Sequence, residues 1–327
     1  MSNDADKSKQ DSSQWVELSH EKGVRTIQAN DWNGFSAFVN NGFTHDDTAV
    51  LWRGQRRVEW KILSSLSRTG KDESLHLMNF RNAVARCTSI EFEIDGNDEK
   101  VEAERLRLWS LGQHHGLATP LTDWSIYPYV ALFFAFAEPD DETEARAVFA
   151  LNWAQIIHHN DQIFSPLFDF ERKIKNPPYD EAFKTHLRTI YGPNFGDDIH
   201  LIEGTSLPAD SRVRLYKWER ARLIKLQIKR FRPRTSENAR IHSQGGHHVY
   251  TPNNIPIEEW IETNTGSKSI ALTKIIIPNL NRKNILRNLN KMNINYLSLF
   301  PDFDGAAKYC NMTLREQTRN RFHLREY

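Results

Sequence analysis

The stretch GQHHGLATPLTDWS, residues 112–125, is followed after one residue by YPYVALFFAFA, residues 127–137. The second stretch is apolar on all sides, which predicts a helix buried at the centre of the protein, and Pro128 suits its first turn. The first stretch is rich in turn-forming residues, and Ser125 at its end can cap the helix. These residues therefore predict a buried central helix that the chain enters through a polar, turn-rich segment.

Shorter patterns on both sides of this helix predict the other elements. Apolar, alternating or β-branched runs predict strands at residues 48–52, 147–153, 223–231, 247–251 and 271–277. Amphipathic periodicity predicts helices at residues 72–87, 102–111 and 281–292, a short helix capped by Asn30, helical turns at 236–244 and a strand or turn at 296–300. Because helices and strands mix without strict β-α-β alternation, the predicted class is α+β.

The predicted organisation is a single mixed domain with short strands, the buried central helix and an additional helical and loop region. Residues 1–25 are expected to form a disordered polar tail, and residues 26–327 the domain itself. Residues 155–212 have a weaker pattern and are interpreted as an insertion or a lid.

The composition excludes several classes of protein. The net charge is +1, from 43 Lys and Arg against 42 Asp and Glu, so no overall field attracts nucleic acid or membrane. The two cysteines, Cys87 and Cys310, lie far apart, which argues against a disulfide framework or a cysteine-type zinc site. There is no signal-peptide pattern and no apolar run near the roughly 20 residues of a transmembrane helix. We expect a cytoplasmic protein; the sequence leaves its oligomeric state open.

Four segments together resemble the FRG domain family. They are Trp52-Arg53-Gly54-Gln55, then QHHGL with TPLTDWS and VALFFA between residues 113 and 135, then Arg240-Ile241 with Gln244-Gly245, and finally FPDFDG at residues 300–305. The second segment is the most specific of the four. The chain departs from the family pattern at Thr122, where Leu is frequent, and at His247 and His248, where Phe is common. The resemblance implies a fold group more directly than a reaction.

A weaker resemblance is to ADP-ribosyltransferases of the Arg–Ser–Glu type. Those enzymes have an aromatic-Arg-Gly at the end of one strand, a Ser/Thr strand leading into a helix, and a third strand with a catalytic Glu. Arg53 and residues 122–125 match the first two elements, whereas Gln244 stands in the best position for the third. The resemblance implies NAD as the substrate and, for a bacterial protein, a role as a toxin or in phage defence.

On this interpretation the site residues have distinct roles. Arg53 is a fork for a diphosphate, and Gly54 lets a ligand approach the backbone. Gln244 orients the reacting ribose but cannot supply the negative charge of a Glu, so catalysis is expected to be weak, altered or lost. The predicted catalytic residues are Arg53, Gln244 and His115. The predicted cofactor-binding residues are Arg53, Gly54, Gln55, Gln113, Thr122, Asp123, Trp124 and Ser125.

Each of these residues also has a structural interpretation. Arg53 can pair with Asp123, and Ser125 can cap the central helix. Thr122 and Ser125 bind a ribose or carboxamide in the functional interpretation, in which Trp124 stacks on a ring; otherwise Trp124 is part of the core. The loop histidines before Gly116, including His115, either act on a ligand or fix the loop.

Residues 212–240 hold eleven basic and two acidic side chains, which is the one strong charge asymmetry in the chain. This basic region predicts a surface for a nucleic acid or protein acceptor, and the alternative is a solvated face.

Two other functions remain open. One is a non-catalytic nucleotide- or nucleic-acid-binding module. The other is a metal-dependent nuclease or hydrolase built from His115, Asp123, Asp302 and Asp304, although the FPDFDG segment is better explained as a turn. Zinc binding by His114, His115, His247 and His248 is the weakest interpretation, and no metal ligand is predicted.

Overall fold

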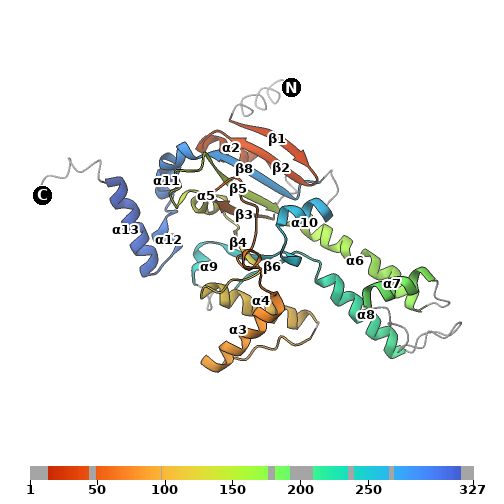
Figure 1. Cartoon of the computed structure of the whole chain (residues 1–327). Coiled ribbons are helices and arrows are strands. Elements are labelled where there is room, and N and C mark those ends of the chain that lie inside the picture. Colours follow the sequence, from red (N-terminus) through yellow and green to blue (C-terminus); the bar gives the residue numbers. More distant parts are fainter. Residues whose placement is uncertain are drawn as a thin grey trace, which may run out of the picture.

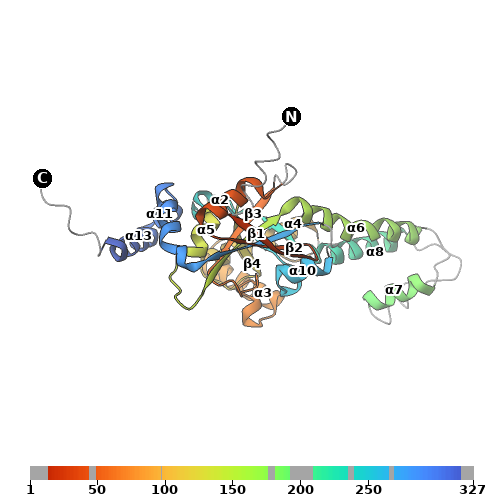
Figure 2. The same cartoon turned by 90° about the horizontal axis from the view of Figure 1, so that it is seen from above.

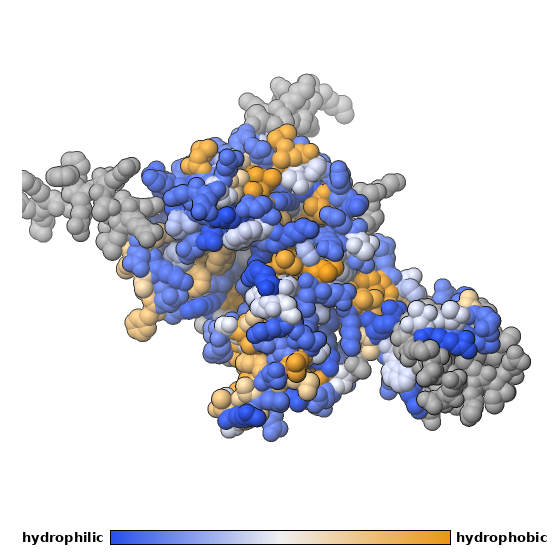
Figure 3. Space-filling view, in the orientation of Figure 1, coloured by the Kyte–Doolittle hydropathy of each residue, from blue (hydrophilic) through white to orange (hydrophobic). Residues whose placement is uncertain are grey.

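The computed structural model describes residues 14–43, 49–96, 98–175, 181–191, 209–234, 239–264 and 269–317 (Figure 1). Within these residues helices surround one mixed sheet, which confirms the predicted α+β class. None of the helices in this part of the chain has the length and apolar character that crossing a bilayer requires. On the face drawn in Figure 3, hydrophobic residues lie in separate patches among hydrophilic ones.

The sheet has eight strands in the order β1-β2-β8-β5-β3-β4-β7-β6. Only β2 and β8 pair in parallel; the other neighbours are antiparallel. The strands are β1 (Trp15–Glu21), β2 (Val24–Ala29), β3 (Val50–Gln55), β4 (Leu121–Ser125), β5 (Ala145–Asn152), β6 (Lys229–Phe231), β7 (Gly246–Tyr250) and β8 (Leu272–Pro278).

The described helices are α2 (Trp32–Asn41), α3 (Glu73–Cys87), α4 (Glu99–His114), α5 (Pro128–Phe136), α6 (Trp153–Lys175), α7 (Glu181–Tyr191), α8 (Ala209–Ile224), α9 (Ala239–Ser243), α10 (Ile257–Asn264), α11 (Arg282–Lys291), α12 (Tyr296–Leu299) and α13 (Phe303–Gln317). Short 3-10 helices lie at Ser67–Thr69, Pro252–Asn254 and Asn279–Asn281.

Two helical layers cover the sheet. Helices α2, α5 and α11 pack on one face, where Phe35, Leu132 and Leu286 share a core with sheet residues. Helix α10 and the start of α6 pack on the other face through Trp260 and Ile156. Helices α3 and α4 form a smaller unit with its own core, to which β4 contributes Leu121. The unit therefore helps to position β4, which carries four of the predicted site residues.

Helices α6 and α8 lie side by side and extend away from the sheet as an arm (Figures 1 and 2). A separate apolar cluster that includes Leu167, Phe170 and Leu215 holds the arm together, with Phe183 of α7 in contact. The weakly patterned residues 155–212 thus form most of this arm in the described part of the chain.

The predicted disordered N-terminal tail, residues 1–25, is too long, because it includes residues that form strands. Residues 1–13 lie outside the described residues, but β1 and the start of β2 form an antiparallel hairpin at the sheet edge. Its turn uses Lys22 and Gly23, both with positive φ. The side chains of β1 are mostly exposed, so backbone pairing orders the segment where no apolar signal exists.

Four other boundaries differ from the sequence predictions. Helix α8 runs to Ile224, and only Lys229–Phe231 of the predicted strand at residues 223–231 is extended, because Leu223 packs in the core of the arm. The predicted strand or turn at residues 296–300 is helix α12, which Asn295 caps through its side chain. Asp31, not Asn30, caps α2 by accepting a hydrogen bond from the Gly34 amide at 3.0 Å.

The end of the turn-rich segment, which precedes the central helix, is also strand rather than loop: residues 121–125 form β4. The central helix itself is confirmed as α5, with side chains from Val130 to Phe136 buried on nearly all sides.

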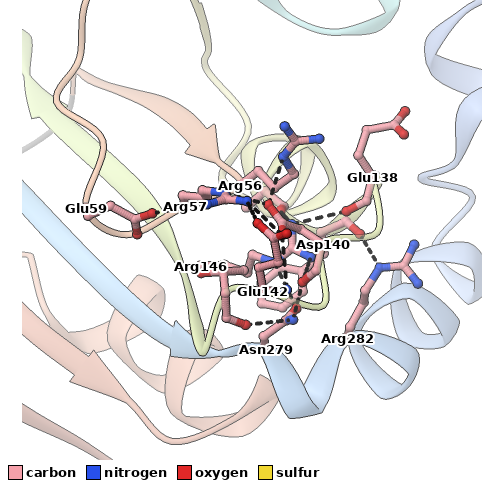
Figure 4. Close-up of polar contacts among 12 residues, drawn as sticks. Arg56, Arg57, Glu59, Glu138, Asp140, Glu142, Arg146, Asn279 and Arg282 are labelled. Atoms are coloured by element: carbon pink, nitrogen blue, oxygen red, sulfur yellow. Dashed lines mark hydrogen bonds and ion pairs between the residues drawn. The ribbon is translucent and has the colours of Figure 1, made fainter.

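Two arginines cap the C-terminal end of α5 (Figure 4). Arg146, on β5, is completely buried and donates at 3.1 Å to each of the carbonyl oxygens of Ala135 and Glu138. Arg282 donates to the carbonyl oxygens of Phe136 and Ala137 at 2.9 and 2.8 Å. The last carbonyls of a helix lack partners within it, so these bonds satisfy groups that would otherwise be buried unpaired.

Replacing Arg146 with methionine should lower the free energy of unfolding by on the order of 3 kcal/mol or more, because at least two buried carbonyls lose their donor at about 1–3 kcal/mol each. Burial lowers the pKa of Arg146 to about 10, so the side chain is still charged near neutral pH. Urea denaturation would measure the loss. The control is Arg86→Met on the exposed side of α3, where the change should stay within about 0.5 kcal/mol; equal effects of the two substitutions would contradict this prediction.

Candidate functional site

A pocket of about 380 Å³ opens between β3 and β4. The two strands pair at one register position only, Trp52 with Ser125, and β4 continues in full register with β7 on its other side. The lining residues are Trp52, Arg53, Gly54, Asp123, Trp124, Ser125, Ala131, Phe134, Ile241, Gln244, Gly246, His247 and Phe300. Arg53, Asp123 and Gln244 therefore converge on one pocket, which the sequence could not establish, and none of the lining residues comes from the arm.

Arg53 spans the opening between the two strands. Its Nη1 donates to the backbone oxygen of Asp123 at 2.6 Å, so the predicted pairing with Asp123 is made through the main chain. Its buried Nε has no hydrogen-bond partner among the described residues. Burial lowers the pKa of Arg53, with the charge of Asp123 opposing this effect, but a guanidinium stays ionised in proteins. Arg53 thus keeps hydrogen-bond donors for a ligand.

Asp123 is the one carboxylate among the residues that line the pocket. Gln113 on α4 donates to its Oδ1 at 2.5 Å, and Nδ1 of the buried His248 lies 3.0 Å from the same oxygen. The side chain is 71% exposed because it faces the open pocket. The removal of water by neighbouring protein groups raises the pKa of Asp123. The interactions with His248, Arg53 and Gln113 lower this pKa by more, so the carboxyl is ionised at neutral pH.

Two of the predicted hydroxyl ligands hold the backbone together instead. Thr122 donates to the carbonyl oxygen of Val249 at 3.1 Å and accepts from the indole of Trp124 at 2.9 Å. It is buried and does not line the pocket. Ser125 lines the pocket, but it donates to the carbonyl oxygen of Gln244 at 2.7 Å and accepts from the Tyr127 amide at 2.9 Å.

Gln244 is held at the opposite wall. Its Nε2 donates to the carbonyl oxygen of Leu299 at 3.0 Å, which leaves its side-chain oxygen for a ligand. The next residue, Gly245, has φ +56°, and a Cβ there would press against the ring of Tyr127. Glycine at this position therefore allows the turn that places Gln244 beside the pocket.

The remaining predicted residues lie at the periphery. Gln55 is buried and donates to the carbonyl oxygen of Lys61 at 3.4 Å, outside the pocket lining. Gln113 does not line the pocket and contributes to the site only through its hydrogen bond to the Asp123 carboxylate. His115 follows α4 as an exposed capping residue, its ring 5.0 Å from that of His114, and does not line the pocket. The structure thus does not bring His115 to the other site residues.

Sequence reasoning missed two parts of the site. His248 was noted as a departure from a family pattern and as a weak zinc-ligand candidate but not as a partner of Asp123, which it faces directly in the β4–β7 register. Phe134 and Phe300 form apolar walls. Strand periodicity could have placed His248 on the same side of the sheet as Tyr250, but its pairing partner comes from a strand more than a hundred residues away.

The part of the chain that the structure describes holds no group of three or more His, Cys, Asp or Glu side chains placed to bind one metal ion. Asp302 instead accepts from Arg240 at 2.7 Å and from the Gly305 amide at 2.9 Å, where it begins α13. The FPDFDG segment is therefore a helix start, and the metal-dependent alternative gains no support.

Substitution of His248 by glutamine should raise the pKa of Asp123, because the strongest interaction that favours its ionised form is removed. Carboxyl ¹³C NMR titration of aspartate-labelled protein would measure this pKa directly. His242→Gln, a change of the same kind at an exposed position of α9, should leave it unaltered. An Asp123 pKa that is the same in all three proteins would show that His248 does not control this carboxylate.

Comparison with known proteins supports one assignment. The sequence model of the FRG domain family matches residues 48–144, a segment that includes β3, α3, α4, β4 and α5. The Gln244 and FPDFDG segments lie outside the matched residues. No curated protein and no solved structure shows significant similarity to the chain. Residues 48–144, which supply Arg53, Asp123 and the helix behind them, are an FRG domain, and the chain is an FRG domain-containing protein.

Proposed function

We propose that this protein binds a nucleotide in the pocket between β3 and β4, and that the nucleotide is NAD, used as a donor of ADP-ribose. The observation that carries the proposal is that Arg53 and Asp123 meet in one pocket with aromatic walls. A guanidinium with unused donors suits a diphosphate, and aromatic side chains suit a flat ring. The volume of about 380 Å³ is within the range of small-molecule sites.

Asp123, rather than Gln244, supplies the negative charge in this proposal. In the transfer, the bond between ribose C1′ and the nicotinamide nitrogen breaks and its electron pair stays on nicotinamide. A lone pair of the acceptor forms the new bond to C1′, and the acceptor loses a proton. The ionised Asp123 offsets the positive charge that develops on the ribose and is placed to accept that proton.

The other residues position the ligand. Arg53 holds the diphosphate, Phe134 and Phe300 enclose the ring, and the free side-chain oxygen of Gln244 accepts from a ribose hydroxyl. His247 also lines the pocket, and burial together with the charges of Arg230 and Arg232 lowers its pKa. It therefore acts as a neutral imidazole at neutral pH. Consumption of NAD by an active enzyme harms a cell, which is the property that a toxin or phage-defence effector requires.

A specific observation favours the alternative, a nucleotide-binding module without turnover. The hydroxyl of Ser125 and the amide nitrogen of Gln244 are both committed to main-chain oxygens. A bound ligand then meets fewer side-chain groups that are free to form new hydrogen bonds as charge develops on the ligand during a reaction. Binding and turnover must therefore be measured separately.

Arg53→Ala should weaken NAD binding by about tenfold or more, because a charge-assisted contact of roughly 1.5–3 kcal/mol is lost. Asp123→Asn should bind NAD nearly as well as the native protein but release nicotinamide about 10²–10³ times more slowly. Titration calorimetry and chromatographic nicotinamide analysis give the two readouts.

The control is Arg86→Ala on the exposed surface of α3, which should change neither quantity. Binding without release in the native protein, with and without cell lysate, would favour the module. Absence of NAD binding by the folded protein would rule out both forms of this proposal.

A further inference from the structure

Three arginines form a row at one edge of the sheet. Arg230 lies on β6, the last strand in the sheet order, and Arg232 and Arg234 follow directly after the strand ends at Phe231. All three are exposed. They therefore place three exposed positive charges within five residues at this edge of the sheet. We refer to Arg230, Arg232 and Arg234 as the β6 arginine row.

The row keeps its charge, whereas much of the surrounding basic region is neutralised. Among the described residues, Arg220 pairs with Glu99 and Lys229 with Glu102, and ion pairs also join Arg222 to Glu219 and Arg240 to Asp302. No ion pair of the row is present within the part of the chain that the structure describes. Arg230 also lies over the ring of Trp153 at 5.2 Å, which fixes its guanidinium in place.

The row runs beside the pocket. Strand β6 pairs with β7, so that Arg230 lies opposite Val249 and Phe231 opposite His248. His247, one residue further, lines the pocket; burial lowers its pKa, and the nearby charges of Arg230 and Arg232 act in the same direction. A chain bound along the row would therefore pass beside His247, which is part of the pocket lining.

We propose that the β6 arginine row binds the phosphate backbone of a single-stranded nucleic acid and presents it to the pocket. Guanidinium groups bind phosphate oxygens with two parallel hydrogen bonds, and several of them close together at an exposed sheet edge suit a repeating polyanion. A single strand fits better than a duplex because a base must be unpaired to reach a pocket. The role as acceptor depends on the proposed ADP-ribosyl transfer, but the binding itself does not.

The test uses the complete chain without NAD and measures binding of fluorescent 20-nucleotide oligo(U) and oligo(dT) by anisotropy. Three phosphate contacts predict a slope of about −2 for log K against log salt, so a fourfold rise in salt should weaken binding roughly 20-fold. The triple variant R230A/R232A/R234A should lose most of this slope. Arg232→Ala alone should reduce it by about 0.7, which provides a second reading if the triple variant folds poorly.

The matched control is R212A/R214A/K217A, which removes three positive charges from α8 on the arm. It should change the affinity far less than the row variant. Equal losses in the two triple variants, an unchanged slope in the row variant, or equally strong binding of polyglutamate would overturn the proposal. Water-dependent nicotinamide release, measured on the same proteins without oligonucleotide, should survive in the row variant, so failure of the row and failure of the NAD site can be told apart.

Discussion

The close contact between β3 and α5 is the constraint on which the rest of the site depends. A side chain on Gly54 would collide with the carbonyl oxygen of Ala131 and lie 2.5 Å from the Ala135 amide nitrogen, so only glycine lets the helix rest on the strand backbone. This contact fixes Phe134 relative to Arg53, its neighbour in the pocket lining. The arginine and the glycine of the WRGQ segment thus have separate roles: Gly54 allows the central helix to pack closely on β3, and Arg53 faces the pocket.

The pocket exists because β3 and β4 separate after one pair of residues. On its far side β4 is held by β7 through five consecutive residue pairs, and β3 is held by β5 through six. Each strand is therefore held in place by its other neighbour. The Arg53 side chain crosses the gap between the two strands and donates to the backbone oxygen of Asp123. This arrangement presents a charged group of each sign to one space without the cost of burying an isolated charge.

The arginines next to α5 and the pocket divide into two groups by what surrounds them. Arg146 and Arg282 donate hydrogen bonds to carbonyl oxygens at the C-terminal end of α5, and these bonds fix the helix in the core. Arg53 retains a buried donor without a partner among the described residues, as a residue awaiting a ligand does. Counting arginines along the chain cannot separate these groups, because the difference depends on which carbonyl or carboxylate oxygens lie within reach.

The sequence by itself determined the α+β class, the buried central helix at residues 127–137 and most of the polar residues near the site, because apolar periodicity and turn chemistry are local properties. It did not determine the N-terminal hairpin, whose exposed strand is ordered by distant backbone pairing. Nor did it show that His115 stays outside while Asp123, Gln244 and His248 come together. Those three residues lie up to 125 positions apart, and only the β4–β7 register and the turn at Gly245 bring them to one place. Register depends on packing over the whole sheet, which no local pattern contains.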